Sequence, residues 1–287
     1  MNLTSPSVLK NLMNDNGIQF NKAFGQNFLI SPNIVWGIVD ECGADADDAI
    51  LEIGPGVGTL TQALCETYSK VVSVEIDRGL IPVLGQTVGG YENFTLINND
   101  ILKVDLHKLF EEHFAGKNVC VCANLPYYIT TPIIMYLLES GLKFKAITVM
   151  VQKEVADRLV SLPGKNGYGA ITAAVNRYGT VKKILNVKAG NFMPAPKVDS
   201  AVISIIPYDE RPYTVKDEKM LTNVINGAFS QRRKTLVNSL ASYLSSFSKE
   251  KITEILISCG YDANIRGETL GIEDFAKLSD ALTDAKN

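Results

Sequence analysis

Residues 51–64 read LEIGPGVGTLTQAL, where a strand pattern, a glycine-rich turn and a helix pattern follow one another directly. Gly54, Gly56 and Gly58 permit a tight turn and let a ligand approach the backbone at the start of a helix. A dinucleotide-binding fingerprint needs its third glycine at position 59, which is Thr59 here. The stretch therefore predicts an α/β fold with a ligand at this turn and disfavours a nicotinamide cofactor. A plain strand-to-helix turn remains an alternative.

Short apolar segments alternate with helical patterns on both sides of this turn, as they do in a doubly wound parallel sheet. The expected strands are 49–53, 70–75, 93–97, 118–123 and 146–152. The expected helices are 33–42, 58–68, 78–86 and 130–140. Ser31 with Pro32 opens the first of these helices, and Thr130 with Pro132 opens the last. Sheets of this kind bind ligands at the carboxyl ends of their strands.

The pattern changes after residue 153. A glycine-rich loop, LPGKNGYGA, is followed by two strand-like segments, KKILNVKAG and SAVISIIPY, and from about residue 215 the chain is helical and polar. Pro207 and Pro212 mark a boundary. We therefore expect a catalytic α/β domain at 1–206 and a small all-α domain at 207–287.

The composition is that of an ordinary globular protein, with 46% hydrophobic and 21% charged residues among 287. No membrane span or secretory signal is recognisable, so we expect a cytoplasmic protein. The five cysteines lack CxxC spacing and are expected to be reduced and mostly buried. His107 and His113 lie in a polar, helix-like stretch. A metal site or a Ser-His-Asp triad is therefore poorly supported.

The net charge of -3 conceals a polarity along the chain. Residues 31–120 carry 14 acids and 5 bases, whereas residues 141–200 carry 3 acids and 10 bases. Attraction to phosphate depends on the local field at the contact surface, so the basic region is able to bind a polyanion despite the acidic total. Lysines scattered over solvated faces are the alternative.

Acidic residues stand at the ends of the next two strands. Glu75 ends the strand in VVSVEID, where a carboxylate can accept hydrogen bonds from both hydroxyls of a ribose. Asp100 follows the strand in FTLINND, where an acid can accept one from an adenine amino group. Taken singly, each acid is as readily a solvated loop residue. Together with Gly54, they predict an adenosine-shaped pocket.

Four motifs, in this order, resemble those of the S-adenosylmethionine-dependent Rossmann-like methyltransferases: EIGPGVG, the acid of VEID, NND and NLPY. NLPY is similar to the motif of the branch that methylates amino groups. FGQNFLI (24–30), NFMPAPKVDSAV (191–202) and AFSQRRKTLVNSL (228–240) closely resemble the bacterial small-subunit (16S) rRNA adenine N6,N6-dimethyltransferase family of the KsgA type. The resemblance implies a Rossmann-like methyltransferase sheet, a small helical C-terminal domain and S-adenosylmethionine as cofactor.

The resemblance also implies the residues that bind the cofactor: Asn27, Leu29, Gly54, Gly56, Glu75, Asp100 and Asn124. Asn27 and Leu29, in an N-terminal arm, are expected to fold over the methionine part. The resemblance further implies that the two glycines lie beneath the methionine and ribose, that Glu75 holds the ribose hydroxyls and that Asp100 meets the adenine. Glu52 is expected as a supporting carboxylate near the methionine end.

The stretch NLPYYITTP, at 124–132, then has a chemical interpretation. An adenine amino group is a poor nucleophile because its lone pair is delocalised into the ring, so it must be aligned with the methyl group. The Asn124 side-chain oxygen and the Leu125 carbonyl can accept its two N–H groups, and Pro126 helps to aim that carbonyl. Tyr127 can stack on the base, whereas Tyr128 is expected to pack inward.

A base inside a helix cannot reach such a pocket, so the target must be unpaired or flipped out. The resemblance implies that Phe192 stacks on the face of the base opposite Tyr127, although a phenylalanine in a proline-containing loop is also suited to plug a core. Arg232, Arg233 and Lys234 are expected to contact RNA phosphates. A solvated helical face is the alternative for these three.

The predicted function is dimethylation of the N6 atoms of two adjacent adenosines in the 3′-terminal hairpin loop of small-subunit rRNA. The expected partner is a partly assembled small subunit, met late in biogenesis by a monomeric enzyme. One alternative is the macrolide-resistance methyltransferase of large-subunit rRNA, which shares the cofactor motifs. MPAPKVDSAV and AFSQRRKTL favour the small-subunit enzyme. A second alternative, a non-catalytic RNA-binding assembly factor, is disfavoured by the intact Asn124 and Glu75.

Overall fold

The structure is a computed structural model that describes residues 1–18, 26–231 and 233–286. They divide into two compact units, one formed by Met1–Ala156 and Val181–Pro207, the other by Asp157–Thr180 and Tyr208–Asn287. The first unit ends one residue beyond the predicted boundary at 206. The prediction placed residues 157–180 in the first domain, whereas they belong to the second unit.

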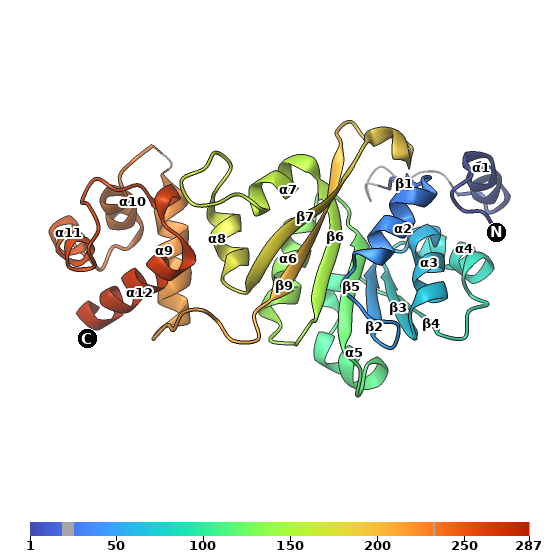
Figure 1. The fold of residues 1–287 in the computed structure, drawn as a ribbon, viewed down its shortest axis with the longest axis horizontal. Helices are drawn as coiled ribbons and strands as arrows, with labels where there is room; N and C mark the ends of the chain where they lie inside the picture. The colour runs from blue at the N-terminus through green and yellow to red at the C-terminus, as the bar shows by residue number, and fades with distance from the viewer. Residues whose placement is uncertain (19–25, 232, 287) are drawn as a thin grey trace. The chain divides into compact units, whose positions relative to one another are not determined.

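The first unit is built on a seven-stranded sheet (Figure 1). In spatial order its strands are β4 (Phe94–Asn98), β3 (Lys70–Glu75), β2 (Ala49–Ile53), β5 (Val119–Asn124), β6 (Ala146–Gln152), β9 (Ser200–Pro207) and β7 (Gly179–Val187). The strands from β4 to β6 are parallel, and β9 is antiparallel to β6. The strand order reverses between β2 and β5, which creates a crevice at their carboxyl ends. The predicted doubly wound sheet is confirmed.

Helices connect these strands close to the predicted positions. Up to residue 159 they are α1 (Pro6–Asp15), α2 (Pro32–Asp40), α3 (Thr59–Thr67), α4 (Ile81–Thr87), α5 (Leu106–His113), α6 (Thr130–Glu139) and α7 (Lys153–Leu159). The predicted helix 78–86 is divided into a 3-10 turn, η2 (Arg78–Leu80), and α4. The Asp77 side chain caps η2, and a proline stands in the first turn of α4. Helices α1 and α7 were not expected from the sequence.

The central strands are apolar and buried. Every residue of β2 is buried, and so are the residues of β3 after Lys70. Continuous burial of this kind is typical of a parallel sheet that helices cover on both faces. All five cysteines are free and buried, as predicted. No helix in the described ranges combines the length and hydropathy that a membrane span needs.

The N-terminal residues are held at two places. Helix α1 buries its apolar side in a cluster that also contains Leu80 and Val83, from η2 and α4. Further along the chain, β1 (Phe28–Leu29) pairs antiparallel with β8 (Phe192–Met193). This pairing fixes the segment around Asn27 and Leu29 beside the sheet.

The second unit is helical and has its own core. Its helices are α8 (Ala170–Asn176), α9 (Glu218–Ser230), α10 (Leu236–Tyr243), α11 (Lys249–Ser258) and α12 (Ile272–Lys286). Tyr168 and Ala173 belong to the apolar cluster of these helices. Burial of these side chains explains why residues 157–180 pack here, although they precede two strands of the sheet.

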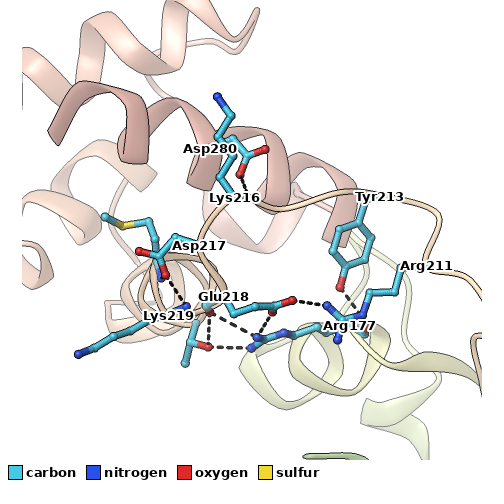
Figure 2. A network of polar contacts seen from close by, with 10 residues as sticks. Arg177, Arg211, Tyr213, Lys216, Asp217, Glu218, Lys219 and Asp280 are labelled. Atoms are coloured by element: carbon cyan, nitrogen blue, oxygen red, sulfur yellow. Dashed lines mark hydrogen bonds and ion pairs between the residues drawn. The ribbon is translucent and has the colours of Figure 1, made fainter. Parts of the chain in front are cut away.

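An ion network joins the end of α8 to the start of α9 (Figure 2). The Glu218 carboxylate accepts hydrogen bonds from Arg177 and Arg211. Arg177 also donates to Thr222 Oγ1 at 2.7 Å, and Tyr213 donates to the Arg177 carbonyl at 2.8 Å. Burial raises the pKa of Glu218, but the hydrogen bonds from the two arginines outweigh it, so that this pKa lies below 4.5. The carboxylate therefore stays ionised between two cations.

We expect Glu218→Gln to destabilise the second unit by about 1 kcal/mol near neutral pH, because the Arg177 side chain is only 12% exposed and loses its acidic partner. Since the folded pKa of Glu218 is depressed, its contribution is present above pH 4.5 and is lost as the pH falls through the folded pKa. Thermal unfolding of wild type and variant should therefore converge on acidification.

Glu254→Gln is the matched control for this variant, because it removes an exposed ion pair with Lys251 on α11. It should change the unfolding temperature little at any pH. Amide hydrogen exchange in α9 would assign the loss to the second unit. A constant difference between wild type and Glu218→Gln down to pH 2 would contradict an ionic role for Glu218.

Candidate active site

A cavity lies at the carboxyl ends of the central strands of the first unit, where the strand order reverses. It encloses about 990 Å³ of space, open solvent at its mouth included. The cavity brings together every residue predicted to bind the cofactor: Asn27, Leu29, Gly54, Gly56, Glu75, Asp100 and Asn124. These residues come from five segments, which are the N-terminal arm and the carboxyl ends of β2, β3, β4 and β5; the four strands are parallel neighbours in the sheet.

The glycine turn after β2 is shaped for close approach. Gly54 and Gly56 have φ angles of +69° and +63°, which favour glycine. A Cβ at position 56 would lie 2.9 Å from the Phe28 ring, whereas a Cβ at position 54 would meet no protein atom within 4 Å. Gly56 therefore lets the N-terminal arm pack on the turn, and Gly54 leaves space beside the backbone for a ligand.

Glu75 ends β3 at the wall of the cavity. Its Oε2 accepts a hydrogen bond from Gly56 N at 3.2 Å, and its Oε1 accepts one from Asp77 N at 2.7 Å. The residue is 4% exposed, and burial raises the pKa of Glu75 to about 7 despite these bonds. Each carboxylate oxygen can accept a further hydrogen bond. The side chain is thus fixed and able to receive two hydroxyl groups.

Glu52 is a second buried acid in the cavity wall. Thr61 Oγ1 and Ser73 Oγ both donate to its Oε2, at 2.8 and 2.6 Å. Burial raises the pKa of Glu52 to about 7, and the nearby Glu75 adds to this effect. The two hydroxyls hold the Glu52 side chain in one orientation.

Asp100 follows β4 and begins the 3-10 turn η3 (Ile101–Lys103). Its Oδ1 accepts a hydrogen bond from Leu102 N at 3.1 Å. Its Oδ2 lies 3.6 Å from Lys103 Nζ. The Lys103 side chain is 77% exposed, so this ion pair contributes little to stability. Asp100 is therefore positioned by its own turn and retains acceptor capacity at the cavity.

Asn124 ends β5 in a fixed orientation. Its Nδ2 donates a hydrogen bond to the Asn27 carbonyl at 3.1 Å, which links the N-terminal arm to the strand tip. This bond holds the amide in one orientation, and Oδ1 is its acceptor atom for a hydrogen bond from a ligand. Leu125 N donates to Met150 O at 3.2 Å and so anchors the next residue as well.

The two tyrosines after Pro126 differ in exposure. Tyr127 is half-buried, lines the cavity and shares a 2.6 Å hydrogen bond with Ser200 Oγ. Tyr128 also lines the cavity but is 57% exposed. The prediction that Tyr128 packs inward is wrong. The predicted start of the next helix at Thr130 is confirmed.

Of the residues that the structure describes, those predicted to stack on the base from the second side and to contact RNA phosphates are not among the residues of this cavity. Phe192 is 3% exposed, pairs with Leu29 and belongs to an apolar core cluster rather than to the cavity wall. This placement favours the core-plug alternative over the stacking role.

Of the predicted basic cluster, Arg233 and Lys234 are exposed between α9 and α10 in the second unit. Arg232 lies outside the described residues.

Several cavity residues were not expected from the sequence, among them Gln26, Phe28 and Ile76. Gln26 Nε2 donates to Asp77 Oδ2 at 2.7 Å and ties the arm to the end of β3. Ile76 is 41% exposed, although it is apolar. Its position directly after Glu75, at a strand tip, is the signal that would have identified it.

The cavity at the switch point of this sheet has the arrangement expected of a Rossmann-like methyltransferase: a glycine turn, an acid at each of the next two strand tips and an anchored Asn124. The family model described as ribosomal RNA adenine dimethylase matches residues 17–284. The chain belongs to the ribosomal RNA adenine dimethylase family.

Curated relatives match almost the whole chain. The ribosomal RNA small subunit methyltransferase A of Alkaliphilus oremlandii is 45% identical and covers 98% of each chain. That of Lachnoclostridium phytofermentans is 48% identical and covers 98% of this chain and 97% of its own length. Both relatives carry names of small-subunit enzymes.

Solved structures share the fold. A dimethyladenosine transferase from Plasmodium falciparum is 28% identical with a TM-score of 0.75, covering 88% of this chain and 95% of its own. The 23S rRNA methyltransferase ErmE is 23% identical with a TM-score of 0.69, covering 90% of this chain and 100% of its own. The second likeness shows the fold alone. Because the curated relatives are named as small-subunit enzymes, the large-subunit alternative is not favoured.

Proposed function

We propose that this protein transfers methyl groups from S-adenosylmethionine to the N6 atoms of two adjacent adenosines in the 3′-terminal hairpin loop of small-subunit rRNA. The observation that carries the proposal is the anchored Asn124 amide, whose donor end is held by Asn27 at a cavity that also contains Glu75 and Asp100. The small-subunit relatives support the substrate.

The cavity residues fit S-adenosylmethionine. The space beside Gly54 admits a ligand against the backbone, and Glu75 offers two fixed oxygens to a pair of ribose hydroxyls. Asp100 lies one strand further along and would meet the adenine. Asn27 and Leu29, which line the cavity from the arm, would hold the methionine part. When bound, S-adenosylmethionine supplies a methyl group on a positively charged sulfur.

The chain itself supplies alignment at the target amine. Asn124 Oδ1 and the Leu125 carbonyl accept the two N–H groups, which turns the nitrogen lone pair toward the methyl group. The Tyr127 ring stacks on the base, and its hydrogen bond to Ser200 holds the ring in place. The methylated amine is acidic enough to lose its proton after transfer, so the chain needs no strong general base.

The substrate is an unpaired or flipped adenine, because a paired base cannot enter the cavity. After the first transfer the amine keeps one N–H, which one acceptor is able to hold for the second transfer. We propose that the partner is a partly assembled small subunit in the bacterial cytoplasm, met late in its maturation by a monomer of this protein. The larger domain carries the catalytic site, and the helical domain contacts the RNA.

The test is to incubate the protein with labelled S-adenosylmethionine and each unmethylated ribosomal subunit separately, and then to map the labelled nucleotides. We expect dimethyladenosine at two adjacent positions near the 3′ end of small-subunit rRNA. Label in large-subunit rRNA alone would support the macrolide-resistance activity. Binding without label in either subunit would support a non-catalytic assembly factor.

The basic cluster of Arg232, Arg233 and Lys234 is proposed to contact RNA phosphates. We expect the double variant Arg232→Glu/Arg233→Glu to bind the small subunit more weakly. The magnitude of the slope of log K against log salt should fall by roughly 1.4 to 1.8, since each of the two lost phosphate contacts lowers it by roughly 0.7 to 0.9. Filter binding at several salt concentrations measures both effects. The matched double variant Lys249→Glu/Lys251→Glu, on α11, should leave the slope unchanged. Equal slopes for wild type and Arg232→Glu/Arg233→Glu would make the cluster a solvated face.

A further inference from the structure

We propose that Tyr128 is the stacking platform for the nucleotide next to the target adenine, and that it positions the RNA strand at the mouth of the cavity. This inference rests on the proposed function. It concerns a side chain that neither the cofactor nor the target amine requires. Because the two target adenines adjoin, the base on Tyr128 is the second adenine while the first is being methylated.

The first observation is the exposure of an aromatic ring beside the site. Tyr128 is 57% exposed and lines the same cavity as Asn124. Among the residues that the structure describes, its hydroxyl makes no hydrogen bond, unlike that of Tyr127. Contacts within the described part of the protein therefore do not explain why an aromatic ring stands at this position. An aromatic ring that lines a cavity and is open to solvent is able to stack on a nucleic-acid base.

The second observation is that the backbone which presents the ring is fixed. The Pro126 carbonyl accepts hydrogen bonds from Ile129 N at 3.2 Å and from Thr130 Oγ1 at 3.1 Å. The intervening turn is thereby closed directly before α6 begins at Thr130. Tyr128 is thus presented by a closed turn, and little backbone entropy is lost when a base stacks on it.

The exposure of the two tyrosines separates their roles. Tyr127 is half-buried and held by Ser200, so its ring suits a base that has entered the cavity. Tyr128 is open to solvent at the mouth of the cavity, where the RNA strand would leave the site. Every base has a flat face for stacking, and an aromatic ring holds single-stranded RNA without reading its sequence. The neighbouring base is therefore the group that the Tyr128 ring reaches.

The test compares steady-state methylation of unmethylated small subunits by wild type, Tyr128→Ala, Tyr128→Leu and Tyr128→Phe. Loss of one base stack should raise KM for the subunit about 5- to 100-fold in the Ala and Leu variants, with kcat within about threefold of wild type. Tyr128→Phe should restore KM, because stacking needs the ring and not the hydroxyl. The affinity for S-adenosylmethionine, measured by calorimetry, should stay unchanged in all three.

Tyr243→Ala is the matched control, because Tyr243 is 45% exposed in the second unit and is not a cavity residue. It should leave KM and kcat unchanged. An unchanged KM in Tyr128→Leu would overturn the proposal, and so would a fall in kcat alone, which would place the ring on the reacting base. Absence of methyl transfer by the wild type would instead refute the proposed function.

Discussion

Asn124→Ala is expected to lower the rate of methyl transfer to small-subunit rRNA about 10²- to 10³-fold, the size of loss seen when one preorganised polar group is removed from a reacting centre. The variant loses the oxygen that accepts an N–H from the target amine, so the nitrogen lone pair is no longer aligned with the methyl group. Binding of the subunit should change by no more than about twofold, because most of the affinity comes from phosphate contacts. Single-turnover assays with labelled S-adenosylmethionine and filter binding measure the two effects.

Two further variants make this experiment specific. Asn124→Asp keeps an acceptor oxygen, but it cannot donate to the Asn27 carbonyl that now lies 3.1 Å from Nδ2. It should therefore be less active than wild type and more active than Asn124→Ala. Asn33→Ala, at an exposed position on α2, should have wild-type activity. Wild-type turnover by Asn124→Ala would remove the acceptor role from this residue.

The central sheet and most of the cavity were predictable from the sequence because local patterns determine them. Buried parallel strands are continuous apolar runs, and β2, β3 and β6 begin and end at the predicted residues. Because the strands are parallel, the residues that follow them all lie at the same end of the sheet. Gly54, Glu75 and Asp100 therefore meet at the predicted place.

Features that depend on distant contacts were not predictable in this way. Phe192 stands in a proline-containing loop, but its burial follows from pairing with Leu29, far away in the chain. Tyr128 follows a half-buried tyrosine, and its exposure depends on how the turn before α6 closes. Residues 157–180 precede two strands of the sheet, yet Tyr168 and Ala173 pack with the C-terminal helices. No local pattern distinguishes these outcomes from their alternatives.

Glu75→Ala should weaken binding of S-adenosylmethionine about 10- to 100-fold in calorimetry, because two hydrogen bonds between a charged carboxylate and the ribose hydroxyls are lost. The variant also loses a contact within the turn, since Glu75 accepts a hydrogen bond from Gly56 N. Thermal unfolding of Glu75→Ala without the cofactor measures the contribution of the turn, because a loosened turn also destabilises the free protein. Glu111→Ala, an exposed acid on α5, should bind the cofactor like wild type.

The raised pKa of Glu75 adds a test that depends on pH. Burial raises this pKa to about 7, and hydroxyl donors favour the ionised carboxylate, so cofactor binding should release a proton below that pH. Wild-type affinity should therefore rise between pH 6 and pH 8, and Glu75→Gln should lose most of this rise. A smaller dependence should remain, because the pKa of Glu52 is also raised to about 7. Affinity that is independent of pH in the wild type, together with unchanged binding by Glu75→Ala, would place the ribose elsewhere in the cavity.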